Sequence, residues 1–350
     1  MIKKITYYIL LFALLIVQYN LFGQEQKKQN SYSKFRSKAS VSRVKEVNEK
    51  LSKAKNLFKK NPKSALDLVH DGLLIAIKEN YLNEEAEAYT ILGQFNFELN
   101  EYSLSLKNYK KAIAIYSKLS SSSKRTKVKS PNNFQKKLNK LFYPAGKSAE
   151  LANNLTLGKT YYRQYLSLAS SSDDMVKARI ALGDVHLKTN ELNTSEEHDK
   201  AALKIEKKRD NKSGITIINL KLGELESKKK NTPKAIEYYR NSQNSALEIN
   251  NDQLVNQAYT NISEIYEDEQ NIEQGIEINQ EALDFNQKRN NKSEESQNNI
   301  NIANFLLQQD KNEEAITHLN NSVIIAEEVG DIENQSKAFK ALSKAYDKTG

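Results

Sequence analysis

Apolar residues recur at helical spacing from Val44 to the end of this chain. Residues 89–97 carry apolar side chains three or four positions apart, and residues 104–115 do the same. The polar pair Asn100-Glu101 separates the two stretches. An apolar stripe of this period predicts an amphipathic helix, and a short polar break between two such stripes predicts a helical hairpin. No stretch alternates with the period of a strand, so the sequence predicts an all-α fold.

Small residues recur at a fixed interval within these predicted helices. Most members of each set are 40 residues apart, and the first six members of the first set each lie twelve residues before a member of the second. The first set is Gly93, Gly146, Gly183, Gly223, Ser263, Ala303 and Ser343, and the second is Ala65, Ser105, Gly158, Ser195, Ala235, Gly275 and Ala315. Small side chains allow two helices to cross closely, and a period of this length is typical of repeat architectures.

The motif within each repeat resembles that of the tetratricopeptide family. One repeat carries it through Tyr89, Leu92, Gly93, Ser105, Tyr109 and Ala112, and another through Tyr259, Ile262, Ser263, Tyr266, Gly275 and Ala282. The period is longer than the usual 34 residues, no tryptophan occupies the first aromatic position, and the closing proline is absent. The resemblance implies a right-handed α-solenoid of about seven and a half hairpins. In that fold the first helix of each hairpin, helix A, lines a concave groove, and helix B lies outside it.

The sequence predicts that this solenoid covers residues 43–350. A Ser- and Lys-rich insertion at residues 120–133 lengthens one interval from 40 to 53, and a tolerated insertion is favoured over a functional loop. Pro144 falls within a helix A, which we expect to restart near this proline because proline lacks the amide hydrogen of a helix interior. The last repeat has only a helix A, with Phe339, Leu342 and Tyr346, so we expect an exposed apolar face there and a natural protein that continues further.

The first 42 residues predict an export signal and a spacer. Lys3 and Lys4 precede an apolar run from Ile5 to Val17, and Gly23 offers a cleavage point, so residues 1–23 resemble a signal peptide. An uncleaved anchor is the alternative, although the run is short for a membrane span of about 20 residues. Residues 24–42 are polar and predict a disordered linker. The chain has no cysteine, which excludes disulfides and a lipid-modified N-terminal cysteine.

Charge is distributed unevenly along the chain. Residues 1–140 contain 27 Lys and Arg against 11 Asp and Glu, whereas residues 141–350 contain 26 against 33. A basic end can attract anionic lipid, nucleic acid or acidic proteins. The lysines are scattered rather than aligned and most of the chain is acidic, so we expect solvated helix faces and no nucleic-acid partner.

No arrangement of residues predicts catalysis, a metal or a cofactor. The four histidines, His70, His186, His198 and His318, have no metal-ligand spacing, although His186 and His198 are placed for contact across one hairpin. A packing role is the simpler interpretation of each. Glycine-rich phosphate loops and nucleophile elbows are absent from the sequence. We therefore expect no enzyme within residues 1–350.

The resemblance places candidate peptide-binding residues on the A helices, beside the small residues of the first set. These are Gln257, Asn261, Glu264, Gln297, Asn301, Asn304, Asp184 and Lys147, together with Gln94, Glu224 and Lys344. Asn261 and Asn301 occupy equivalent positions, with Gln257 and Gln297 one turn earlier, and such amides can pair with a peptide backbone. The simpler explanation of these amides is that asparagine is abundant throughout the chain.

The sequence therefore predicts an exported, periplasmic or periplasm-facing module that binds a protein or peptide in its concave groove. The long period, the signal and the Asn- and Lys-rich composition resemble the sensory regions of two-component histidine kinases from Bacteroidetes-like bacteria. In that interpretation the membrane is reached through the N-terminal segment or through a later one. The alternative is a free periplasmic scaffold or cell-envelope adaptor without a signalling output.

Overall fold

The computed structural model of the chain describes residues 40–125 and 131–349, and every regular element in these ranges is an α-helix. The expected signal peptide at residues 1–23, and the expected linker up to residue 39, lie outside the described residues. Residues 40–42, which were also expected to be linker, already belong to the first helix. None of the described helices is long and apolar enough to cross a bilayer.

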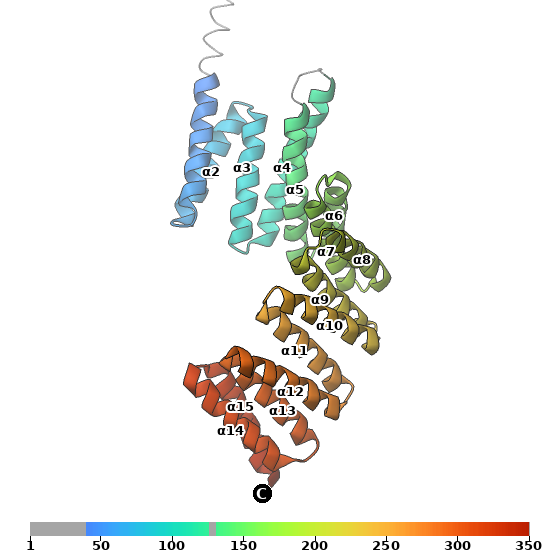
Figure 1. Cartoon of the computed structure of the whole chain (residues 1–350). Helices are drawn as coiled ribbons and strands as arrows, with labels where there is room; N and C mark the ends of the chain where they lie inside the picture. Colours follow the sequence, from blue (N-terminus) through green and yellow to red (C-terminus); the bar gives the residue numbers. More distant parts are fainter. Residues whose placement is uncertain (1–39, 126–130, 350) are drawn as a thin grey trace, which may run out of the picture. The chain divides into compact units, whose positions relative to one another are not determined.

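The chain divides into two compact units, Met1–Tyr161 and Tyr162–Gly350. The first unit contains a helix over residues 40–57, followed by α2 (Pro62–Lys78), α3 (Leu82–Glu98), α4 (Tyr102–Arg125), α5 (Pro131–Leu151) and the start of α6 (Leu155–Leu168). The second unit contains α7 (Ser172–Lys188), α8 (Leu192–Lys208), α9 (Lys212–Lys228), α10 (Thr232–Glu248), α11 (Asp252–Asp268), α12 (Ile272–Arg289), α13 (Lys292–Gln308), α14 (Asn312–Val329) and α15 (Ile332–Thr349). Figure 1 shows these helices as successive antiparallel pairs. Seven hairpins and one further helix lie within the described residues, which confirms the predicted α-solenoid.

The helices follow one another through short turns whose backbone is left-handed at one residue. In α7–α15 this residue recurs every 20 positions, at Asn190, Asp210, Lys230, Asn250, Gln270, Asn290, Asp310 and Gly330. The amide of the residue after the left-handed one then returns to a carbonyl of the last turn, as in Asn231 N to Glu226 O at 2.9 Å. Asparagine side chains cap several of the following helices, as Asn251 does by accepting from the Leu254 amide at 3.1 Å.

Lys230 occupies the left-handed position with φ 59°, where a side chain with a Cβ is strained. We expect Lys230→Gly to raise the free energy of unfolding by about 0.5–1 kcal/mol, because glycine removes that strain. Asn250→Gly is the matched control at φ 53°, and its gain should be smaller because asparagine tolerates this conformation. Chemical denaturation of the three proteins measures the effect, and a lower midpoint for Lys230→Gly would contradict it.

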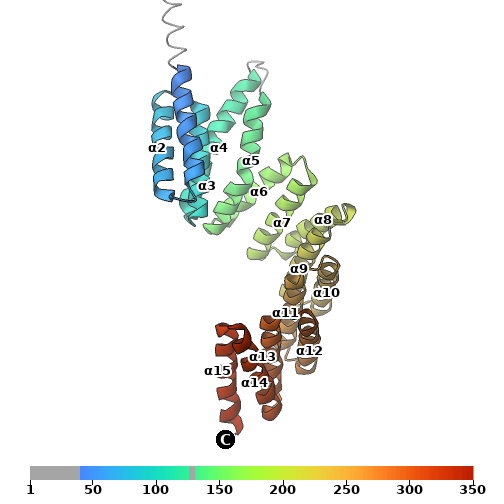
Figure 2. The ribbon, with the colours of Figure 1, turned by 60° about the vertical axis from the view of Figure 1, so that its left-hand side comes forward.

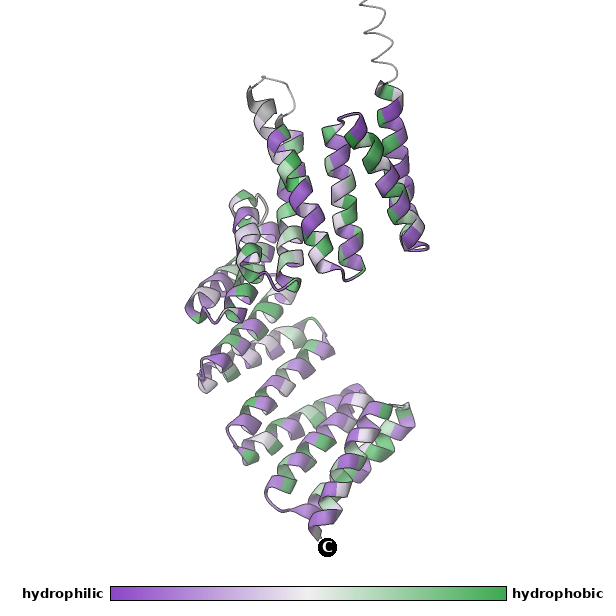
Figure 3. Ribbon diagram, turned by 180° about the vertical axis from the view of Figure 1, so that it is seen from behind, coloured by the Kyte–Doolittle hydropathy of each residue, from purple (hydrophilic) through white to green (hydrophobic). Residues whose placement is uncertain are grey.

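The apolar cores join each hairpin to the helix that follows it. One cluster combines residues of α7, α8 and α9, another combines α9 to α12, and a third combines α12 to α15. Figure 2 shows α13, α14 and α15 side by side, and Figure 3 shows hydrophobic and hydrophilic residues alternating along single helices. A helix with one apolar face cannot cover that face alone, so each hairpin depends on its neighbour for burial.

The small residues lie at the predicted helix crossings. Ser105 Oγ donates to the Gly93 carbonyl at 2.6 Å, and Ser195 Oγ donates to the Gly183 carbonyl at 2.9 Å. A Cβ on Gly223 would lie 2.5 Å from the Tyr239 ring of the partner helix. Ser343 is the one exposed member of the two sets, because it lies on α15, which ends the array of described helices.

One expectation about a helix boundary is wrong. Pro144 does not mark a restart, because α5 begins at Pro131 and continues through Pro144 to Leu151. The lost backbone hydrogen bond is offset by the contacts of a long helix, in which Leu141, Phe142 and Ala145 are buried around the proline. Most of the 120–133 insertion is also helical, since α4 extends to Arg125 and α5 starts at Pro131. Residues 126–130 lie outside the described residues.

The last helix exposes apolar side chains as expected. Ile332 is 77% exposed, and Phe339 and Tyr346 are each 54% exposed. At the position of Phe339, the preceding repeats carry Tyr259, whose ring contacts Phe285 of helix B, and Asn299, which is hydrogen bonded to His318. Phe339 thus occupies a position that contacts a helix B in the two preceding repeats.

Candidate functional site

The A helices of the second unit form one continuous side of the stack. Helix α9 contacts α11 and α13 contacts α15, whereas no two successive B helices make comparable contact in the described part of the chain. Lysines tie some A helices to one another: Lys228 Nζ donates to the Leu187 carbonyl, and Lys348 Nζ donates to the Leu307 carbonyl, both at 2.9 Å. The tetratricopeptide resemblance predicts that the A helices line the inner side of the solenoid, and we call their side the concave side.

A hollow of about 290 Å³ lies on this side between α11, α13 and α15. Its walls are polar apart from one aromatic ring, and they consist of Thr260, Ser263, Glu264, Glu267, Gln297, Asn301, Asn304, Phe305, Gln308 and Lys337. Four of the predicted groove residues, Glu264, Gln297, Asn301 and Asn304, therefore line one site. Three successive A helices build it, which agrees with their equivalent positions in the repeat.

Two of the amides in this hollow are held by internal hydrogen bonds. Gln297 Nε2 donates to Asn301 Oδ1 at 2.8 Å, and Gln297 Oε1 accepts from Lys337 Nζ at 3.2 Å. Asn301 Nδ2 donates to Asn279 Oδ1 on α12 at 3.1 Å. The side chains of Asn304 and Gln308 are exposed on α13, and neither side chain has a hydrogen-bond partner within the described residues. The amides open to a ligand are thus Asn304 and Gln308, while Gln297 and Asn301 support the wall.

The acidic wall of the hollow carries negative charge close together. Burial raises the pKa of the Glu264 carboxyl, and the neighbouring carboxylates of Asp268 and Glu267 raise it further. No ion pair neutralises Glu264 or Glu267 within residues 40–125 and 131–349. This wall therefore favours a cationic or hydrogen-bond-donating group.

The other predicted groove residues lie elsewhere. Gln257 is exposed on α11 but does not line the hollow, and Asn261 is hydrogen bonded to Tyr239. Asp184 on α7 forms an ion pair with Lys221 on α9 at 2.5 Å. Lys147 belongs to the first unit, where it pairs with Glu150 at 3.2 Å. The structure thus gathers half of the predicted set at one place.

Gln94, Glu224 and Lys344, the further candidates on the A helices, lie outside the hollow as well. Gln94 Nε2 donates to Glu98 Oε1 at 3.0 Å in α3 of the first unit. Glu224 on α9 and Lys344 on α15 are exposed. The concave side therefore offers polar groups along its length, and only a part of it is hollowed.

Two histidines meet across the α7–α8 hairpin, as their positions suggested. The rings of His186 and His198 stack with centroids 5.5 Å apart, and His186 Nδ1 lies 2.8 Å from Glu191 Oε2. Burial lowers the pKa of His198 to about 4, aided by His186 and by Arg179 and Arg163. Within the described residues no three potential ligands come together for a metal ion.

One notable residue was missed by the sequence analysis. Asp199 on α8 is 2% exposed, and its Oδ1 has no hydrogen-bond partner. Burial raises its pKa to about 7, with a further increase from Asp184 and Glu224 that Lys221 opposes. The signal was present in the repeat: sixteen residues after the small residue of helix A, other repeats have Tyr109, Tyr162 or Tyr239, and this repeat alone of those four has an acid.

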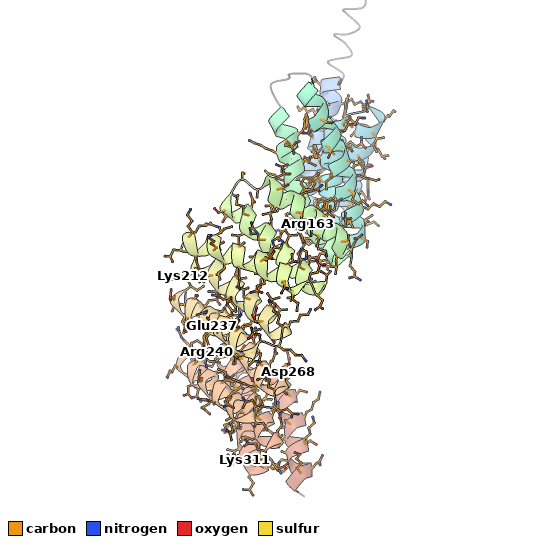
Figure 4. All side chains as sticks on the ribbon, turned by 90° about the vertical axis from the view of Figure 1, so that its right-hand side faces the viewer. Arg163, Lys212, Glu237, Arg240, Asp268 and Lys311 are labelled. Atoms are coloured by element: carbon orange, nitrogen blue, oxygen red, sulfur yellow. The ribbon has the colours of Figure 1, made fainter. Side chains whose placement is uncertain are left out.

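A second hollow, of about 530 Å³, lies between α8, α9 and α10. Its lining includes Leu203, Lys212, Asn219, Glu237, Tyr238, Asn241 and Asn244. Figure 4 shows Lys212, Glu237 and Arg240 on one side of the picture and Asp268 on the other. Helices α8 and α10 are B helices, so this hollow is distinct from the concave one.

Comparison with known proteins supports the same class. Residues 86–119, which cover most of α3 and most of α4, match the family model described as tetratricopeptide repeat. Aspartyl phosphate phosphatase F from Bacillus subtilis is similar in structure, with a TM-score of 0.52, 15% identity, and coverage of 85% of this chain and 79% of that one. The apo form of RapI gives 0.49 at 13% identity over 76% of this chain and 98% of its own. No curated protein matches the sequence.

The fold is therefore an α-solenoid of tetratricopeptide type, and this class of fold indicates a module for protein–protein interaction. At this level of identity the structural likeness concerns the fold alone.

Proposed function

We propose that the concave side of the second unit binds an extended peptide segment of a partner protein. The observation that carries the proposal is the hollow between α11, α13 and α15, in which the unpaired amides of Asn304 and Gln308 face the carboxylates of Glu264 and Glu267. An amide offers both a donor and an acceptor, which is what a peptide backbone requires. Binding, and not catalysis, is the activity that this lining supports.

Selection from a random peptide library on the immobilised full chain tests this function. We expect selected peptides to lose roughly tenfold in affinity for Asn304→Ala/Gln308→Ala, because each lost hydrogen bond costs about 0.5–1.5 kcal/mol. Asn241→Ala/Asn244→Ala is the matched control, since it removes two exposed amides from the second hollow, between α8, α9 and α10. The proposal fails if no peptide is enriched, or if the selected peptides bind both double variants equally.

The Asn261→Ala/Asn301→Ala variant would be a less suitable test. Asn261 bonds to Tyr239 and Asn301 to the buried Asn279, so alanine at these positions also disturbs the packing of the hairpins. Asn304 and Gln308 have no such internal role.

We further propose that the chain is exported and serves as the input region of a membrane signalling protein of the histidine kinase type. Its support is the sequence: Lys3 and Lys4 before the apolar run that ends at Val17, and the long-period repeats. A free scaffold or adaptor of the cell envelope is the second candidate, and the same groove would serve it. Fusion of residues 1–42 to a reporter that is active only after export tests the location. A reporter that stays inactive would contradict export.

A further inference from the structure

The concave side carries an acidic row that ends in the hollow at Glu264. Asp184, Glu224 and Glu264 occupy the same position in three successive repeats, directly after the small residue of helix A, and so lie on α7, α9 and α11. Glu224 and Glu264 are exposed, and neither forms an ion pair within the described residues. Asp184 is half-buried and pairs with Lys221.

A buried carboxyl group lies beneath this row. It belongs to a B helix, whereas the three acids of the row belong to A helices. Asp199 on α8 faces Gly183, such that a Cβ on that glycine would lie 2.3 Å from Asp199 Oδ1. The charged groups that act on it are Asp184 on α7 and Lys221 and Glu224 on α9, all from A helices. Its Oδ1 is buried and has no hydrogen-bond partner. Three carboxyl groups thus share the single cation of Lys221.

An uncompensated buried acid is costly to the protein on its own, since a buried polar group without a partner loses its hydration. The four groups Asp184, Asp199, Glu224 and Lys221 sum to an excess of negative charge on the concave side. A cation brought by a ligand would remove this excess. Glu264 extends the same sign of charge to the next A helix and into the hollow.

Resting on the proposed peptide-binding function, we infer that the partner segment is basic and presents a lysine or arginine to each of α7, α9 and α11. Helices in contact, as α9 and α11 are, lie about 8–10 Å apart. A polyproline II backbone advances about 9.3 Å per turn of three residues, and therefore places every third side chain on one face at a matching spacing. The segment that fits is thus an extended one with a cationic residue at every third position.

The probe is a synthetic peptide with three lysines, one at every third position, separated by alanine and proline. The control peptide has the same sequence with glutamate in place of each lysine. We expect calorimetry with the full chain at low salt, about 0.01 M, to detect the lysine peptide and not the glutamate peptide, since charges are screened little there. Glu224→Gln/Glu264→Gln should weaken the lysine peptide by about tenfold. Glu237→Gln/Glu273→Gln, which removes two exposed acids from the B helices α10 and α12, should leave binding unchanged.

At pH 8, where the Asp199 carboxyl is ionised, Asp199→Asn removes the buried charge and leaves the exposed surface as it was. It should weaken the lysine peptide by about two- to fivefold, less than the exposed pair does, because the carboxyl acts on the cation from beneath. Circular dichroism confirms the fold of each variant before binding is measured.

The inference is overturned if the glutamate peptide binds as well as the lysine peptide, or if Glu224→Gln/Glu264→Gln binds the lysine peptide as tightly as the control variant does. Library peptides that still depend on Asn304 and Gln308 would then leave the groove intact as a binding site for segments of other charge. If those peptides fail as well, the proposed function fails with the inference.

Discussion

Asp199→Asn is expected to be more favourable to stability at pH 8 than at pH 4. The change that it causes in the free energy of unfolding should differ between the two pH values by on the order of 4 kcal/mol. In the folded chain, burial and the negative charge of Asp184 raise the pKa of Asp199 to about 7, whereas its ordinary pKa is 3.8. Each pKa unit corresponds to about 1.36 kcal/mol, and the difference here is about three units.

The direction follows from proton linkage. Between pH 4 and pH 7 the unfolded chain has released the proton of Asp199 while the folded chain keeps it, so stability falls as the pH rises through this window. The stabilising contribution of the neutral carboxyl is complete below pH 4 and is lost above pH 7. Asparagine has no proton to release, and its variant lacks this loss.

Urea denaturation of the parent and of Asp199→Asn at pH 4 and pH 8 gives the effect of the substitution on the free energy of unfolding at each pH. The contributions of the other titrating groups are common to both proteins and largely cancel in the difference. Glu197→Gln, an exposed substitution on the same helix, should change the free energy of unfolding by less than about 0.5 kcal/mol at either pH. Equal effects of Asp199→Asn at the two pH values would show that the carboxyl is not buried as described.

The fold could be predicted from the sequence because small residues set the phase of every repeat. At Gly93, Gly183 and Gly223 a Cβ would lie less than 3 Å from a side chain of helix B, and the regular spacing of such small residues fixes both the number of hairpins and the pairing of helices A and B. The left-handed turn residues every 20 positions were a further signal, and one that asparagine partly hides because it is common throughout the chain.

Pro144 shows where local rules fail. Proline disfavours a helix interior, but α5 is long and buries Phe142 and Ala145 beside the proline, so tertiary contacts outweigh the lost hydrogen bond. The spacing of the insertion likewise gave its length but not its structure, because extension of α4 and α5 depends on contacts between those two helices.

The site was predicted in part for a related reason. Repeat phase places Glu264, Gln297, Asn301 and Asn304 on neighbouring A helices, and that is sufficient to bring them together. The position within the repeat does not show which amides already form hydrogen bonds inside the protein. The bond from Asn301 to Asn279 depends on the position of a side chain on another helix, and only the structure gives it.

Gly223→Ala is expected to lower the free energy of unfolding by about 1–3 kcal/mol, although alanine is the better helix former by about 1 kcal/mol. The new methyl group would lie 2.5 Å from two carbons of the Tyr239 ring. That ring is 4% exposed and belongs to the core of α9 to α12, so it cannot turn aside without opening the crossing. Overpacking therefore outweighs the gain in helix propensity.

Gly158→Ala provides the matched control in the first unit. Its added Cβ would lie no closer than 3.4 Å, at the Gly146 carbonyl oxygen, which is an ordinary contact. We expect this variant to be neutral or more stable by about 0.5–1 kcal/mol, since only helix propensity changes. Urea denaturation of both variants decides the matter, and a Gly223→Ala protein as stable as the parent would mean that α9 and α10 are not in close contact.

The double variant Gly223→Ala/Tyr239→Leu identifies the cause of the loss. Leucine lacks the ring that meets the new methyl group, so in its presence Gly223→Ala should cost at least about 1 kcal/mol less than in the parent. Leucine itself occupies the equivalent position in another repeat, as Leu319, sixteen residues after Ala303, and there both residues are fully buried. The pair Ala303 and Leu319 therefore shows that this crossing accepts a methyl group once the aromatic ring is absent. If the two substitutions simply add, the loss in Gly223→Ala arises elsewhere than at Tyr239.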